Sequence, residues 1–113
     1  MIISRHPDVE RDIRELNKKY STPLESLEAW ERIFSVKGFE FTPGIDRFPG
    51  FGGCNIYKAR VAPLKENCGK SSGYRIIFRK CDDGNCIVLF LYRHSTVVNE
   101  QEVIDTIRYR LSH

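Results

Sequence analysis

The stretch from residue 56 to residue 92 places the strongest constraint on the fold, because three of its segments have the residue pattern of β-strands. Residues 56–61 and 74–80 alternate with period 2, so that successive side chains point to opposite faces of a sheet. Residues 87–92 hold no charged side chain, which is typical of a strand buried on both faces inside a sheet. These segments predict a β-sheet at the centre of the domain.

Strand periodicity also places the basic residues. Lys58 and Arg60 are two apart in the first strand, and Arg75 and Arg79 are four apart in the second, so each pair shares one face of its strand. We therefore expect a sheet with one apolar side covered by helices and one side on which four cations converge: Lys58, Arg60, Arg75 and Arg79.

The charge of the chain is concentrated in the same region. The net charge is only +3 over 113 residues, but residues 56–80 hold seven basic side chains and a single acidic one, a net +6. The rest of the chain is therefore net acidic. A local basic patch on such a body predicts that a polyanion is bound at one site.

Chain length and hydropathy limit the broad class. A chain of 113 residues is expected to form one domain, spanning residues 1–113. The apolar run at residues 87–92 is far shorter than the roughly 20 residues that cross a bilayer, and the N-terminus has no apolar core of a secretory signal. We expect a cytoplasmic protein. The glycines at 50–53 precede a strand and not a helix, so they do not form a phosphate-binding loop, and no cofactor is expected.

The four cysteines are expected to be mainly unpaired thiols, since the chain has no secretory signal. Cys81 and Cys86 flank a predicted hairpin turn, which leaves an occasional disulfide between them as an alternative. Their spacing suits zinc poorly, and Cys54 and Cys68 have no neighbouring histidine. The sequence therefore predicts no metal site.

Three helices are predicted around the sheet. Apolar residues at positions 9, 13, 16 and 20 predict an amphipathic helix that starts near Pro7, with the charged residues between them, Asp12 included, facing solvent. Residues 22–25 form a capping-box pattern that starts a second helix, and residues 99–102 form another that starts the closing helix. The second helix is expected to end at residues 37–38 and to bury Leu27, Trp30, Ile33 and Phe34.

Residues 38–55 contain five glycines and four phenylalanines and predict a long irregular loop. The phenylalanines are expected to pin this loop to the domain; the alternative is that one of them stacks on a base. The order β-α-α-β-β-β-α predicts an α+β domain with a small twisted antiparallel β-sheet, two N-terminal helices and one C-terminal helix, the helices lying on one face of the sheet.

The strand segments at residues 56–61, 69–78 and 87–92 together resemble the RelE/ParE superfamily of bacterial and archaeal toxins, in particular its RelE and HigB branch. The helices before and after them fit as well, so the resemblance covers nearly the whole chain. It implies a RelE-like fold and the toxin of a type II toxin-antitoxin system. Such toxins are ribosome-dependent endoribonucleases that cleave mRNA in the decoding site and are held inactive by a cognate antitoxin.

The resemblance also implies site residues. Lys58 and Arg60 match the two basic positions of the first long strand, and Arg75 matches the arginine that follows glycine-tyrosine. The basic position after the last strand falls at Arg93 or His94. Several family members carry a catalytic tyrosine near the start of the last helix, where this chain has valine and isoleucine. The implied catalytic set is Lys58, Arg60, Arg75 and His94, and the further cations expected to bind RNA are Arg79, Lys70, Lys65 and Arg93.

These residue types suit metal-independent RNA cleavage. Attack by the RNA's own 2′-hydroxyl needs a base, positive charge at the phosphorus, and an acid for the leaving oxygen. Arg75 is the expected phosphate clamp, because a guanidinium can hold two oxygens at once. Lys58 among other cations is a candidate base, and His94 a candidate acid or base.

Other interpretations stay open at the level of sequence. Arg60 and Arg79 can be solvated strand residues, and His94 can be an ordinary turn residue. The whole chain can also be a ParE-like toxin that acts on a protein such as gyrase, or a non-catalytic member of the same fold that binds only RNA or an antitoxin.

Overall fold

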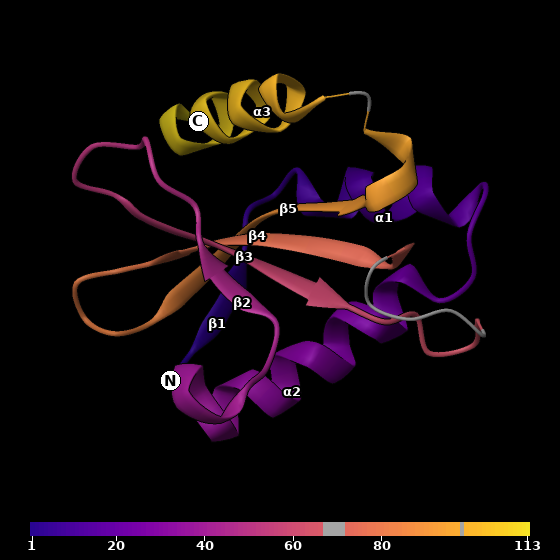
Figure 1. Cartoon of the computed structure of the whole chain (residues 1–113), viewed down its shortest axis with the longest axis horizontal. Helices are drawn as coiled ribbons and strands as arrows, with labels where there is room; N and C mark the ends of the chain where they lie inside the picture. Colours follow the sequence, from indigo (N-terminus) through magenta and orange to yellow (C-terminus); the bar gives the residue numbers. More distant parts are fainter. Residues whose placement is uncertain (67–71, 98) are drawn as a thin grey trace.

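The computed structural model describes residues 1–66, 72–97 and 99–113, and in these ranges it confirms the predicted α+β class (Figure 1). Three α-helices surround a five-stranded sheet, and a 3₁₀ turn links the last strand to the last helix. The elements in chain order are β1 (Ile3–Arg5), α1 (Val9–Asn17), α2 (Pro23–Phe41), β2 (Ile45–Arg47), β3 (Asn55–Val61), β4 (Tyr74–Lys80), β5 (Cys86–Arg93), the 3₁₀ turn (His94–Thr96) and α3 (Glu100–Ser112).

The sheet is mixed, with strand order β1-β5-β4-β3-β2. The pairs β2–β3, β3–β4 and β4–β5 are antiparallel, as predicted, whereas β1 pairs in parallel with β5. The prediction of a wholly antiparallel sheet is therefore wrong at its first strand. Strand β4 lies at the centre, and its first five residues are all buried, which agrees with helices packing on both of its faces.

Helices cover both faces of the sheet, so the prediction that they share one face is wrong. Residues of α1 and α2 pack with Ile76 and Phe78 in one core, whereas Val103 and Ile107 of α3 pack with Ile77 in a second core. Figure 1 shows α2 and α3 on opposite sides of the sheet. Strand alternation explains the arrangement, because β4 has isoleucine or phenylalanine on each face and both faces need an apolar cover.

The segment at residues 38–55 is more regular than predicted. Helix α2 continues through a kink at Gly38, whose φ of 70° is readily adopted only by glycine, and a short strand, β2, follows. Phe39 and Phe51 pack against the two cores and Phe48 is buried in the second, which confirms that phenylalanines pin this segment. Phe41 is an exception, because it is 67% exposed.

Two details of α2 differ from prediction and one agrees. Trp30 is buried as expected, but Ile33 is half exposed. Thr22 precedes the helix in a left-handed conformation and its side chain makes no capping hydrogen bond, so this capping box does not form. The capping residue of α3 does form its bond: Asn99 Oδ1 accepts from the Glu102 N–H at 3.1 Å.

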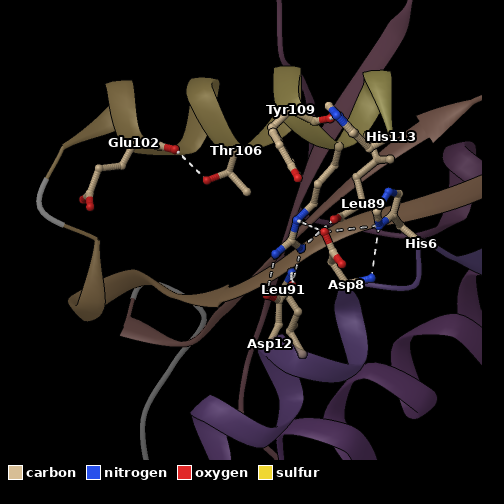
Figure 2. Close-up of polar contacts among 10 residues, drawn as sticks. His6, Asp8, Asp12, Leu89, Leu91, Glu102, Thr106, Tyr109 and His113 are labelled. Carbon is tan, nitrogen blue, oxygen red and sulfur yellow. Dashed lines mark hydrogen bonds and ion pairs between the residues drawn. The ribbon is translucent and has the colours of Figure 1, made fainter.

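Asp12 is buried, contrary to the prediction that it faces solvent. Its carboxylate receives two hydrogen bonds from Arg110 at 2.6 and 2.8 Å and one from the Leu91 N–H at 3.0 Å (Figure 2). Arg110 also donates to the Leu89 carbonyl at 2.9 Å. Strand β1 pairs with β5 only as far as Val88, so these two side chains satisfy backbone groups on the edge of β5 that β1 no longer covers.

In the described part of the chain, no helix is long and apolar enough to cross a bilayer.

Candidate functional site

The predicted face shared by the four basic strand residues is present. In the register of β3 and β4, Arg60 lies opposite Arg75 and Arg79 lies opposite Ile56, and Lys58 is opposite Ile77. Directly opposed residues point to the same side of a sheet, so all four cations are on the side of Ile56 and Ile77. This is the side that α3 covers in part, so the cations lie around the helix and not on an open sheet.

A bulge in β5 adds a tyrosine to this face. Phe78 pairs with Val88 and Ile77 pairs with Phe90, which leaves Leu89 as an extra residue in β5. An extra residue reverses the alternation of the strand beyond it. Tyr92 therefore lies opposite Arg75, on the face of the cations, where unbroken alternation from Val88 would have turned it toward α1 and α2.

The site itself is a cleft of about 280 Å³ between the sheet and the start of α3. The sheet contributes Lys58 and Tyr92, and the 3₁₀ turn contributes His94, so two of the four predicted catalytic residues meet here. The Lys58 ammonium lies 5.7 Å from the centre of the Phe48 ring, which forms one wall. The full lining is Phe48, Lys58, Tyr92, His94, Val97, Asn99, Glu100 and Val103.

Arg75 lies beside this cleft and does not line it. Only 5% of its surface is exposed, and its Nη1 donates to the Tyr74 carbonyl at 3.2 Å. Burial lowers the pKa of Arg75; the neighbouring Tyr92 acts in the opposite direction, and Arg60 lowers it further. The guanidinium remains charged, since its ordinary pKa is far above neutrality, and it supplies positive potential to the phenol of Tyr92.

Tyr92 was missed by the sequence analysis. Burial raises the pKa of its phenol, Arg75 lowers it, and Glu100 raises it again. The hydroxyl is therefore protonated at neutral pH and can donate a hydrogen bond or a proton within the cleft. The sequence signal for Tyr92 was a single hydroxyl at the end of an otherwise apolar strand, and without the bulge its face could not be assigned.

The structure separates Arg60 and Arg79 from the cleft. Arg60 is exposed and its guanidinium lies 3.3 Å from the Asp46 carboxylate, which lowers the positive field there. Asp46 is directly opposite Lys58, so it belongs to the same face. Arg79 is partly buried, and its Nε has no hydrogen-bond partner among the described residues.

Arg93 occupies a different environment from the one predicted for an RNA contact. It is buried and donates to both oxygens of Glu66, at 2.8 and 2.7 Å, and to the Ser72 carbonyl at 2.9 Å. Its guanidinium lies over the rings of Tyr20 and Tyr74, 4.5 and 5.0 Å from their centres. The hydrogen bond with Glu66 raises the pKa of Arg93. This geometry indicates that Arg93 anchors the β3–β4 connection.

The remaining predicted RNA contacts lie in that connection. Lys65 is exposed next to Glu66, and Lys70 lies outside the described residues. Among the described cysteines, Cys54, Cys81 and Cys86 are thiols, and burial raises the pKa of Cys86 to about 11. Cys68 also lies outside the described residues. The described part of the chain contains no group of three metal-ligating side chains.

No family model, no curated protein and no solved structure matches this chain.

Proposed function

We propose that this protein is a metal-independent endoribonuclease that cleaves mRNA on the ribosome, as the toxin of a type II toxin-antitoxin system. The observation that carries the proposal is the meeting of Lys58, Tyr92 and His94 in one cleft, with the Arg75 guanidinium beside Tyr92. These groups supply a cation, a proton donor and an imidazole that can accept a proton, which together suit phosphoryl chemistry on RNA.

The proposed reaction is attack of a ribose 2′-oxygen on the neighbouring phosphorus. His94 accepts the proton of the 2′-hydroxyl while the bond between the 2′-oxygen and phosphorus forms. The bond from phosphorus to the 5′-oxygen breaks, and Tyr92 donates its proton to that oxygen. The products are a 2′,3′-cyclic phosphate and a 5′-hydroxyl. Lys58 contacts the phosphate. The positive charge of Arg75 stabilises both the negative charge that develops on the phosphate and the phenolate that Tyr92 becomes.

The resemblance to the RelE and HigB branch supplies the cellular part of the proposal. It adds the ribosome as the place where mRNA is presented, a cognate antitoxin as the partner, and the cytoplasm as the location. The cleft supports a dependence on the ribosome, because Lys58 and His94 are the only basic residues that line it in the described part of the chain. A cleft with so few cations binds free RNA weakly. An enzyme of this kind therefore needs another particle, here the ribosome, to position its substrate.

Induced expression in a bacterial host tests the proposal directly. The measurements are the rate of protein synthesis and the positions of new mRNA 5′ ends, for the wild type and for Lys58→Met, Tyr92→Phe and the control Lys37→Met, whose side chain is exposed on α2 outside the cleft. We expect translation to stop with cleavage inside codons. Lys58→Met and Tyr92→Phe should each lower cleavage by about 100-fold, and Lys37→Met by far less.

Other outcomes point to the other members of this fold. Cleavage that is unchanged in both Lys58→Met and Tyr92→Phe would show that the cleft is not the active site. Growth arrest with DNA damage and intact mRNA would favour a toxin that acts on a protein such as gyrase. Harmless expression of a folded wild-type protein would favour a member that only binds RNA or an antitoxin.

A further inference from the structure

A carboxylate lines the proposed RNA cleft, where it has no part in the cleavage chemistry. Glu100, the first residue of α3, shares the cleft with Lys58 and His94, and it lies close enough to the buried hydroxyl of Tyr92 to raise that phenol's pKa. A carboxylate can only accept hydrogen bonds and repels phosphate oxygens. Glu100 therefore weakens the binding of a ligand that offers only phosphate. It favours a ligand that also has a group that donates hydrogen bonds.

The walls around Glu100 suit a flat ring. Phe48 and Tyr92 supply aromatic surface from the sheet side, and Val97 and Val103 supply apolar surface from the side of α3. Unpaired RNA bases bind by stacking on aromatic rings, with their Watson–Crick edges hydrogen-bonded by side chains. The cleft thus combines a cation for phosphate, apolar walls for a base, and polar groups of α3 for the edge of that base.

Asn99 supplies a donor next to the Glu100 acceptor. The Asn99 side-chain oxygen accepts the capping bond from the Glu102 N–H at 3.1 Å, so the amide NH₂ group is the part that can reach a ligand. Both Asn99 and Glu100 line the cleft. Adjacent residues at this corner therefore present one donor and one bidentate acceptor.

We propose that this corner of the cleft selects guanine, with Glu100 accepting from the guanine N1–H and N2–H groups and Asn99 donating to O6. The proposal rests on the proposed function and names the base preference of the same site. Guanine alone offers two adjacent donors to a carboxylate. Adenine and cytosine place a ring-nitrogen acceptor beside their amino group, and uracil has one N–H between two carbonyl oxygens, so each sets an acceptor against the Glu100 carboxylate.

Binding of short RNA tests the proposal without the ribosome. The probes are 2′-O-methyl pentaribonucleotides, which cannot be cleaved, with G, A, C or U at the centre and uridines on either side, measured by fluorescence anisotropy at low salt. The wild type should bind the G-centred probe at least about tenfold more tightly than the others. Glu100→Gln should lose this preference while its affinity for the all-uridine probe stays equal or rises.

The control is Asp105→Asn, which removes the same charge from an exposed site on α3 outside the cleft and should keep the preference. Thermal melting of each variant establishes that it is folded. Equal affinity of the wild type for all four probes, or a guanine preference that survives in Glu100→Gln, would overturn the base assignment and leave the proposed function standing. If the wild type binds no probe and also cleaves no mRNA on ribosomes, both the base assignment and the proposed function are contradicted.

Discussion

The contact between Asp12 and Arg110 shows how two side chains can replace a missing strand. The residues are 98 positions apart, and both are at least nine-tenths buried. Their groups are bonded to each other and to the backbone of Leu89 and Leu91, next to the bulge that orients Tyr92. A buried charge without its partner is strongly unfavourable, so this pair holds α1, β5 and α3 together only as long as both members are present.

Arg110→Met is expected to lower the free energy of unfolding by about 3–5 kcal/mol, because it leaves the Asp12 carboxylate buried and unpaired. Urea denaturation followed by circular dichroism measures the change. The matched control is Lys18→Met, which breaks the exposed pair between Lys18 and Glu15 and should cost less than about 1 kcal/mol. Similar losses in the two variants would show that the Asp12–Arg110 pair does not support the fold.

At the scale of elements, the connection from β3 to β4 is held at both of its described ends. Arg93 of β5 binds Glu66 and the Ser72 carbonyl, and Gly73 packs against the end of β3. A Cβ at Gly73 would collide with the carbonyl oxygen of Val61. The glycine that precedes Tyr74 is therefore required by close backbone approach, a reason that is independent of any contact with RNA.

Gly73→Ala is expected to lower the free energy of unfolding by about 1–3 kcal/mol, since the backbone of Val61 has to move to make room. Gly53→Ala is the matched control. A Cβ at Gly53 meets no atom within 4 Å, so this variant should be neutral or slightly stabilising. Thermal unfolding of both variants checks the prediction, and an equal effect of the two would contradict it.

The Glu66–Arg93 pair should make stability depend on pH. The hydrogen bond from Arg93 lowers the pKa of Glu66 below the ordinary value of 4.5. A carboxylate whose pKa is lower in the folded state contributes stability above its unfolded pKa, and that contribution is lost as pH falls through the folded-state pKa. The difference in unfolding free energy between wild type and Glu66→Gln should therefore be largest above pH 4.5 and should shrink as the pH falls below that value.

Urea denaturation at several pH values measures this gap. Glu40→Gln, at an exposed position in α2, serves as the control and should show a small gap that is nearly constant with pH. A gap for Glu66→Gln that is equally constant would show that the pair contributes nothing through ionisation.

At the scale of the whole molecule, the distribution of charge favours local binding in the proposed complex with RNA. The chain has a net charge of only +3, and the cation-bearing face is interrupted by α3 and by Asp46. Buried Arg75 and Arg93 do not add to the accessible positive surface. The residues that the structure describes therefore lack the broad basic surface that would bind nucleic acid without regard to position.

The salt dependence of RNA binding should reflect this small number of contacts. If Lys58 is the cation of the cleft that neutralises a phosphate, the logarithm of the association constant should fall with the logarithm of salt concentration with a slope of about −0.7. Lys58→Met should reduce the magnitude of the slope by about 0.7, and Lys18→Met, at the residue that follows helix α1 and outside the cleft, should leave it unchanged. Anisotropy titrations of single-stranded RNA over a range of salt test this, and an unaltered slope in Lys58→Met would contradict it.

Part of the fold and part of the candidate site follow from local sequence. The long strands, the helices and the face of Lys58, Arg60, Arg75 and Arg79 were predicted, because strand and helix periodicities are properties of neighbouring residues. The same reasoning failed for Asp12. A charged residue on a helix is usually solvated, and nothing near it in the chain indicates a partner 98 residues away.

The amino-acid sequence by itself determined which segments form strands and helices, and that the basic side chains of β3 and β4 share a face. Only the tertiary structure decided that α3 covers this face, that Arg93 is held by Glu66, and that an extra residue in β5 turns Tyr92 toward Arg75. The physical reason is that periodicity acts between neighbours along the chain, whereas burial, bulges and ion pairs depend on which distant segments the fold brings into contact.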